Sequence, residues 1–235
     1  MAEFEDKFVE TSFGKIHARL RHGDEKCIYF VHGLGASLLS WSLLVPLLPQ
    51  SLGICLVDLL GHGKSDAPEG PYSLDLQAKA LIELSKSIGK PSFLFGHSYG
   101  ALVALEYAIQ ERLEKLIIED CADIGSIANI AKSSKENEFI NRNPMLLAAN
   151  RRVIKSIIEN SIKERQFNTE ILGKIAAPTL IICGENDSVA SIEKAAELKA
   201  SIKESSLAII SGAGHVPHYT HPCEVAKRLV EFLGK

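Results

Sequence analysis

The sequence predicts an α/β fold in which a mostly parallel central sheet carries helices on both faces. Short apolar runs alternate along the chain with longer segments of helical periodicity, as in consecutive β-α-β units. Nearly all of these runs are continuous, as expected for strands covered on both sides. The length of 235 residues suits one domain, or one domain with a modest insertion.

The strands are expected in two groups. The chain opens with a hairpin formed by residues 7–11 and 15–20, with a turn at Ser12-Phe13-Gly14. Six buried strands follow, and because they alternate with helices we expect them to be parallel. Their expected positions are residues 26–31, 53–58, 92–95, 116–119, 179–183 and 207–210.

Helices are expected between the strands, where apolar residues recur with helical spacing. Each one connects two strands or closes the chain, which is the arrangement that covers both faces of a parallel sheet. The expected helices are residues 38–48, 74–87, 101–110, 192–201 and 224–233.

One segment interrupts this alternation. Residues 124–174 contain no convincing strand, and the spacing of Val153, Ile154 and Ile157 indicates an amphipathic helix. Nine Lys or Arg against five Glu give the segment a net charge of +4, in a chain whose net charge is −3. We therefore expect a helical insertion at 124–174 and a core domain made of residues 1–123 and 175–235.

Composition excludes several classes of function. The small net charge of −3 gives no electrostatic basis for nucleic-acid binding. No stretch has the length of a membrane span, and the acidic N-terminus does not have the pattern of a signal peptide. The five cysteines are odd in number and lack Cys-x-x-Cys spacing, which favours reduced core residues. We expect a cytoplasmic protein that binds neither nucleic acid nor membrane.

The strongest local signal is Gly96-His97-Ser98-Tyr99-Gly100, between an expected strand and an expected helix. A serine on a tight strand-to-helix turn is held in a strained conformation that exposes its hydroxyl, and the turn requires small neighbours. Gly96 and Gly100 meet that requirement. The sequence therefore predicts that Ser98 is a nucleophile rather than an ordinary turn residue.

A serine hydroxyl needs a base, and His215 is the best placed of the eight histidines. It follows the expected strand 207–210 in a glycine-bearing loop, at the sheet edge where catalytic groups of open α/β sheets gather. A carboxylate is then needed to fix its tautomer. Asp187, after strand 179–183, is the first choice and Asp120, after strand 116–119, the second, because Asp187 gives the chain order Ser, Asp, His.

An attacked carbonyl becomes an oxyanion that backbone N–H groups must stabilise. The N–H of Tyr99, directly after the nucleophile, is one expected donor. We expect the other from Leu34, in His32-Gly33-Leu34-Gly35 after the strand 26–31, where glycines allow a close approach to substrate.

Taken together, these segments resemble the α/β-hydrolase superfamily, and the resemblance covers nearly the whole chain. The matching segments, in order, are His32 to Gly35, Asp58-Leu59-Leu60-Gly61-His62-Gly63-Lys64-Ser65, Gly96 to Gly100, Gly184 to Asp187, and Gly212-Ala213-Gly214-His215. The resemblance implies an α/β-hydrolase fold, with residues 124–174 as a short helical cap over the active site. It also implies that the segment from Asp58 to Ser65 is structural, so His62 and Asp58 are assigned no catalytic step.

Differences from known branches of the superfamily narrow the reaction. Epoxide hydrolases and haloalkane dehalogenases carry aspartate where this chain has Ser98. Tyr99 and Val216 stand where proline iminopeptidases and carbon–carbon bond hydrolases, respectively, often have Trp. The resemblance thus implies a carboxylic ester hydrolase that acts through an acyl-enzyme on a small ester-like substrate.

Several alternatives remain open. A carbon–carbon bond hydrolase, a thioesterase, an acyltransferase or perhydrolase, and a receptor with slow turnover could all use the same triad. His215, His218 and His221 are spaced three apart, but Pro217 and Pro222 interrupt any helix that would align them for a metal. We expect no metal and no cofactor. The basic excess in the cap is read as a solvated helix face rather than as an anion-binding surface.

Overall fold

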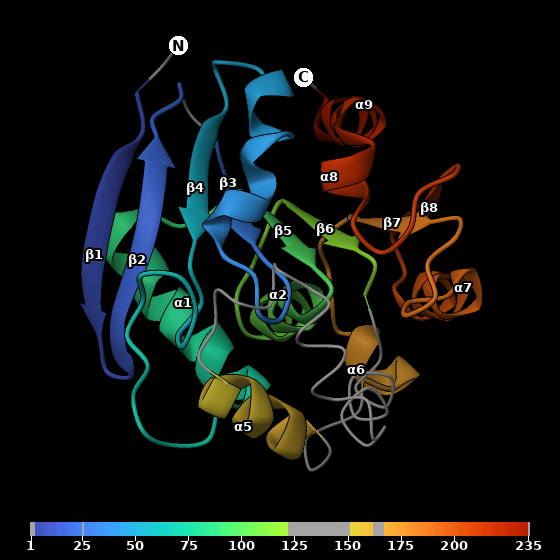
Figure 1. The fold of residues 1–235 in the computed structure, drawn as a ribbon. Helices are drawn as coiled ribbons and strands as arrows, with labels where there is room; N and C mark the ends of the chain where they lie inside the picture. Colours follow the sequence, from blue (N-terminus) through green and yellow to red (C-terminus); the bar gives the residue numbers. More distant parts are fainter. Residues whose placement is uncertain (1–2, 25, 122–150, 162–166, 235) are drawn as a thin grey trace.

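The computed structural model describes residues 3–24, 26–121, 151–161 and 167–234. These residues form an eight-stranded sheet in the order β1-β2-β4-β3-β5-β6-β7-β8 (Figure 1). β1 and β2 pair antiparallel as the predicted hairpin, and all neighbours from β4 to β8 are parallel, as predicted. β2 also pairs antiparallel with β4, which the sequence did not indicate. The strands are β1 (Glu5–Thr11), β2 (Gly14–Arg21), β3 (Cys27–Val31), β4 (Gly53–Val57), β5 (Phe93–His97), β6 (Lys115–Glu119), β7 (Thr179–Gly184) and β8 (Ser205–Ile210).

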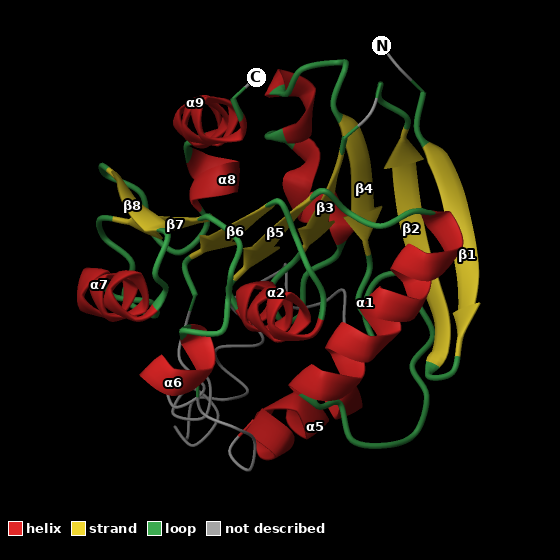
Figure 2. Cartoon of the chain, turned by 180° about the vertical axis from the view of Figure 1, so that it is seen from behind, coloured by secondary structure: helices red, strands yellow, loops and turns green. Residues whose placement is uncertain are grey.

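Helices cover both faces of the sheet, and each face has its own apolar core (Figures 1 and 2). One face carries α1 (Leu74–Ile88), α2 (Tyr99–Gln110) and α7 (Ile192–Ser201). The opposite face carries the 3-10 helices η1 (Leu38–Ser42) and η2 (Val45–Leu47) together with α8 (Pro217–Thr220) and α9 (Pro222–Leu233). This arrangement explains why the parallel strands read as continuous apolar runs.

The predicted helix at residues 38–48 is wrong in kind. The chain forms two short 3-10 helices there, and Ser37 caps the first by accepting from the N–H of Leu39. Pro46 is the reason, because it has no N–H and its ring would collide with the carbonyl of Ser42 in a continuous α-helix. The apolar residues that predicted one α-helix are instead distributed over two short 3-10 helices.

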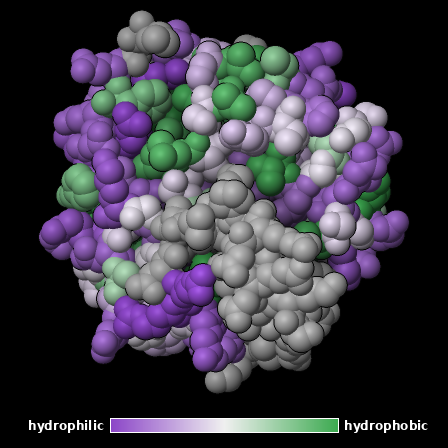
Figure 3. Space-filling view, in the orientation of Figure 1, coloured by the Kyte–Doolittle hydropathy of each residue, from purple (hydrophilic) through white to green (hydrophobic). Residues whose placement is uncertain are grey.

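The helices η1 and η2 bury one side and expose the other. Trp41 and Leu44 are fully buried, whereas Leu39, Leu43 and Leu47 are 63%, 46% and 44% exposed. Figure 3 shows apolar residues among polar ones on the upper part of the face drawn, where these helices lie in Figure 1.

The predicted insertion at 124–174 is described in part. Its described residues form α5 (Arg151–Ser161) and α6 (Thr169–Leu172), while residues 122–150 and 162–166 lie outside the described residues. The apolar stripe of α5 is buried as its spacing predicts, with Val153 and Ile157 fully buried. A Cβ added to Gly61 would lie 2.4 Å from Val153 Cγ1, so α5 packs closely on the loop after β4. The exact extent of the insertion stays a prediction.

Two sequence expectations on the chain as a whole can be compared with the structure. All five cysteines lie among the described residues and none forms a disulfide. No helix in the described ranges is long and apolar enough to span a bilayer.

Candidate active site

Ser98 stands on a strained turn between β5 and α2. Its φ of 52° and ψ of −116° lie in a region that non-glycine residues rarely adopt, at a cost on the order of 1–3 kcal/mol. The turn leaves no room for a side chain at position 96 or at position 100. A Cβ at Gly96 would lie 2.3 Å from the Gly100 carbonyl oxygen, and one at Gly100 would lie 2.3 Å from that of Val31. The glycines are therefore required by the close approach of β3, β5 and α2.

Three side chains from separate loops meet at this turn. His215 Nε2 lies 3.0 Å from Ser98 Oγ, and His215 Nδ1 lies 2.8 Å from Asp187 Oδ2. A carboxylate only accepts, so Nδ1 carries the proton and Nε2 faces the serine hydroxyl as an acceptor. The structure thus brings together the three residues that the sequence singled out.

Asp187 is held in its ionised form. Its side chain is completely buried, which raises the carboxyl pKa, but the hydrogen bond from His215 and the nearby backbone N–H groups outweigh burial and leave the pKa below its usual value. One of those donors is the N–H of Val189, 2.7 Å from Oδ1. Asp187 can therefore orient the imidazole and balance a positive charge on it.

The second candidate acid, Asp120, has a different environment. Its Oδ1 accepts from the N–H of Gly184 at 2.9 Å. Burial, and after it the neighbouring Glu119, raises the pKa of Asp120 to about 10, so this carboxyl is neutral near pH 7. The hydrogen bond to His215 is made by Asp187, which agrees with the order of preference drawn from the sequence.

The two expected oxyanion donors flank Ser98. Tyr99 is the first residue of α2, so its N–H lies at the positive end of the helix dipole. Leu34 follows Gly33, which lies against the nucleophile, since a Cβ at Gly33 would be 3.3 Å from Ser98 Cβ. Gly35, on the other side of Leu34, adopts a φ of 75°. The roles of Leu34 and Tyr99 in holding an oxyanion stay predictions.

A buried polar network holds the loop that carries Leu34. His62 accepts from the N–H of Gly35 at 3.1 Å and donates from Nδ1 to the Leu60 carbonyl. Burial, and after it the neighbouring His32, lowers the pKa of His62 to about 3, so its ring stays neutral and keeps this tautomer. His62 therefore has a structural role, as the resemblance implied.

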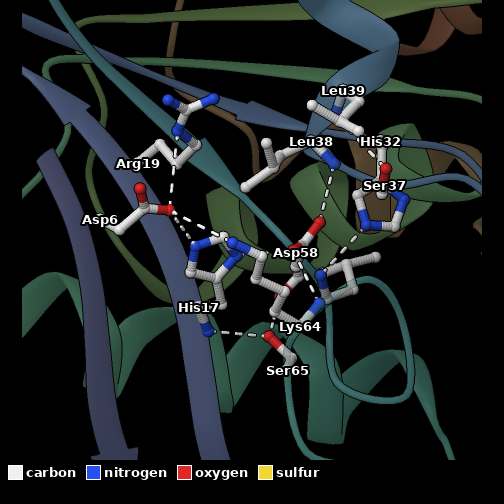
Figure 4. Close-up of polar contacts among 11 residues, drawn as sticks. Asp6, His17, Arg19, His32, Ser37, Leu38, Leu39, Asp58, Lys64 and Ser65 are labelled. Carbon is white, nitrogen blue, oxygen red and sulfur yellow. Dashed lines mark hydrogen bonds and ion pairs between the residues drawn. The ribbon is translucent and has the colours of Figure 1, made fainter. Parts of the chain in front are cut away.

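Asp58 forms a second network, which reaches the N-terminal hairpin (Figure 4). Its Oδ1 accepts from the N–H of Leu38 at 2.8 Å, and its Oδ2 accepts from the N–H of Lys64 at 3.0 Å and from His17 Nδ1 at 2.7 Å. His17 reaches Asp6 through its other ring nitrogen. His17 carries no signal in the sequence, because it lies in a plain alternating strand with no motif around it.

Three further buried residues near the site, with no role predicted from the sequence, are His97, Glu119 and His218. His218 Nδ1 is hydrogen-bonded to the carboxyl of Glu119, and both side chains are completely buried. His221, the third of the histidines spaced three apart, has its Nδ1 2.9 Å from the Thr220 hydroxyl.

Two sets of described side chains bring metal-ligating atoms within 4.8 Å of one another. The first set is His97, Asp120 and His215, and the second is His97, Glu119 and His218. A cation on the first set would occupy the histidine that the triad needs as a base. The second set is completely enclosed apart from the 6% exposure of His97.

Comparisons with known proteins bear on the family and the fold. Residues 28–228 match the model of the Alpha/beta hydrolase family. Monoacylglycerol lipase abhd6-B of Xenopus laevis is 26% identical over 272 aligned residues, which cover 97% of this chain and 79% of the relative.

Solved structures show the same fold. A thermophilic esterase from Thermogutta terrifontis has a TM-score of 0.79 at 22% identity, over 99% of this chain and 98% of its own. The carboxylesterase CesB of Bacillus subtilis has a TM-score of 0.78 at 20% identity, over 98% and 92% of the two chains. The fold class predicted from the sequence is confirmed. With its sheet order, its strained serine turn and a family match that spans most of its length, this chain belongs to the alpha/beta hydrolase family.

Proposed function

We propose that this protein is a serine hydrolase that cleaves a carboxylic ester, or a related acyl bond, through an acyl-enzyme on Ser98. The observation that carries the proposal is the continuous chain of hydrogen bonds from Ser98 Oγ to His215 at 3.0 Å and from His215 to Asp187 at 2.8 Å. A chain of this kind converts a weak hydroxyl into a nucleophile.

The first half of the reaction forms the acyl-enzyme. Ser98 Oγ adds to the substrate carbonyl while His215 Nε2 accepts the hydroxyl proton, and the imidazolium is balanced by Asp187. The carbonyl oxygen takes the negative charge and is held by the N–H groups of Leu34 and Tyr99. The protonated His215 then gives its proton to the departing alcohol as the bond to the acyl carbon breaks.

The second half returns the enzyme to its starting state. Water adds to the acyl carbon as His215 accepts one of its protons. The tetrahedral intermediate collapses, the bond to Ser98 Oγ breaks, and His215 reprotonates that oxygen. The products are a carboxylic acid and an alcohol.

Support for an ester comes from the named relatives, which include a monoacylglycerol lipase, an esterase and a carboxylesterase. The alternatives with the same triad differ in the bond cleaved, as with thioesters and carbon–carbon bonds, or in the group that accepts the acyl chain. Alternatives that differ in the acceptor can be separated by the products formed when a second nucleophile competes with water, and those that differ in the bond cleaved by comparing turnover of substrates that carry each bond.

The test combines active-site labelling with turnover. The wild type should react with a fluorophosphonate at Ser98 and should hydrolyse p-nitrophenyl esters of graded chain length with an initial burst when deacylation is slow. Ser98→Ala should abolish the labelling and lower kcat by roughly a thousandfold or more.

Ser87→Ala is the matched control, because Ser87 is an exposed residue on α1 that takes no part in the proposed site. A wild-type protein that neither labels nor turns over any ester or thioester would refute the proposal. A Ser98→Ala variant with wild-type rates would refute it as well.

A further inference from the structure

A column of buried aromatic rings lies under the triad. The ring of Trp41 is 4.2 Å from that of His218, His218 is 4.7 Å from His97, and His97 is 5.2 Å from His215, all between centroids. Trp41 and His218 are completely buried and His97 is 6% exposed. The catalytic-site histidine therefore rests on a packed support that extends from the core.

His97, the ring of this column next to His215, contacts the backbone of His215. His97 Nε2 lies 2.7 Å from the His215 carbonyl oxygen. Since a carbonyl only accepts, Nε2 carries the proton. Burial, together with the neighbouring rings of His218 and His215, holds the pKa of His97 well below its usual value. His97 is thus a neutral ring with a fixed tautomer that donates to the loop of the base.

The same ring lies against two other parts of the site. Its backbone directly precedes Ser98, and its Nδ1 would lie 2.9 Å from a Cβ added at Gly33. His97 therefore touches the serine turn, the loop expected to supply an oxyanion donor, and the loop of the base. One residue connects segments that are 118 positions apart in the chain.

The other backbone hydrogen bonds of the loop that carries His215 lie before this residue. The N–H of Gly212 donates to Glu185 at 2.8 Å, and the Ala213 carbonyl accepts from the N–H of Asn186 at 2.8 Å. The side chain of His215 is tied to Asp187 by one hydrogen bond, about which the ring and its loop could still rotate. Among the described residues, the hydrogen bond from His97 is the one that reaches the backbone of His215 itself.

His218 packs against the ring of His97, and Glu119 holds His218 by a hydrogen bond. The backbone of Glu119 is the β6 partner of His97, and its carboxyl is hydrogen-bonded to His218 Nδ1. Burial raises the pKa of Glu119 well above its usual value and lowers that of His218 to about 3, so the pair is neutral. His97 consequently packs against an uncharged neighbour.

We propose that His97 is a positioning residue for the reaction: by donating from Nε2 to the His215 carbonyl, it keeps the imidazole within reach of both Ser98 and the leaving group. The inference rests on the proposed function and adds a residue to it. A misplacement of a reacting group by about 1 Å can cost roughly a hundredfold in rate, so a loss of this restraint should be measurable.

The test compares variants that differ in the donor at this position. H97Q places an amide N–H₂ near the position of the imidazole Nε2. H97M keeps a similar side-chain volume but has no donor. H97N has a donor on a side chain that is too short to reach the His215 carbonyl. We expect H97M and H97N to lower kcat on a p-nitrophenyl ester by about 10- to 100-fold, with KM within about twofold of wild type. H97Q should recover kcat to within about fivefold, and the rate of fluorophosphonate labelling should follow the same order.

Stability and pH profiles separate positioning from packing. We expect the kcat/KM profile against pH to differ from wild type in H97M and to return toward the wild-type profile in H97Q, while the urea midpoints of the two variants agree. His22→Met is the control, since the His22 side chain is 83% exposed. Should H97M fail to fold, the comparison of H97N with H97Q still tests the donor.

The proposal is overturned if H97Q, H97N and H97M all match wild type, or if all lose activity only in proportion to their unfolded fraction. A wild-type protein with no labelling at Ser98 would instead refute the proposed function. The two failures are therefore distinguishable.

Discussion

His17 Nδ1 lies 2.7 Å from the carboxylate of Asp58, and this contact joins the N-terminal hairpin to the loop after β4 (Figure 4). The other nitrogen of His17 is 2.6 Å from Asp6 on β1. The ring is buried, and Asp58 in turn holds the first turn of η1 through Leu38. His17 and Asp58 together therefore link the edge strand β1 to the start of η1.

His17→Ala should therefore destabilise the protein. The substitution removes a hydrogen bond from a buried carboxylate, and an uncompensated buried polar group costs about 1–3 kcal/mol. We expect the free energy of unfolding, measured by urea titration, to fall by about 1–3 kcal/mol. His22→Ala, on the same hairpin but exposed, should stay within about 0.5 kcal/mol of wild type. Equal stability of the two variants would show that the His17 contacts contribute nothing.

Asp187→Asn should lower kcat by about 10⁴-fold. The amide can donate to His215 Nδ1 and so favours the wrong tautomer, in which Nε2 cannot accept the Ser98 proton. Steady-state kinetics with a p-nitrophenyl ester provide the measurement. Asp120→Asn is the matched variant, and it should keep kcat within about tenfold, because Asp120 is already neutral at pH 7. A larger loss of kcat in Asp120→Asn than in Asp187→Asn would reverse the assignment of the acid.

Asp120→Asn should also stabilise the fold, and more so at pH 9 than at pH 5. The pKa of Asp120 is about 10 in the folded protein, so the folded state keeps a proton that the unfolded state releases above about pH 4. Unfolding then releases a proton, and stability decreases as pH rises through this window. Urea unfolding of both proteins at the two pH values measures the difference. A difference that does not change between pH 5 and pH 9 would contradict the raised pKa.

Asp187 should act in the opposite sense. Its folded pKa lies below the unfolded value, so the stabilisation from its ionised form is present above about pH 4 and is lost as pH falls through the folded pKa. Stability measured from pH 6 down to pH 3 should fall less steeply in Asp187→Asn than in wild type. Parallel curves for the two proteins would show that Asp187 gains nothing from His215.

Gly100→Ala should destabilise the fold severely. The added Cβ would lie 2.3 Å from the Val31 carbonyl and 2.4 Å from that of His32, so α2 and β3 would have to move apart. We expect a loss of more than about 3 kcal/mol, measured by chemical unfolding. Gly89→Ala has open space around the Cβ but a φ of 108° and a ψ of 137°, so it should cost about 1–3 kcal/mol from backbone strain alone. Similar losses in both variants would contradict a steric role for Gly100.

The sequence by itself determined which segments form strands, most of those that form α-helices, and the three residues that meet at the serine turn. Continuous apolar runs, the Gly96 to Gly100 turn and the loops bearing Asp187 and His215 are local patterns, and local patterns can be read from consecutive residues. Parallel strands then bring their following loops to one edge of the sheet, so the convergence of Ser98, Asp187 and His215 followed from topology.

Only the tertiary structure decided what supports them. His97 meets the backbone of His215, His218 meets Glu119, and His17 meets Asp58 across 118, 99 and 41 positions of sequence. No periodicity or spacing marks such pairs, because each depends on which side chains two separate elements turn toward each other. The neutral state of Asp120 and His62 is likewise a property of their burial, and burial exists only once the chain has folded.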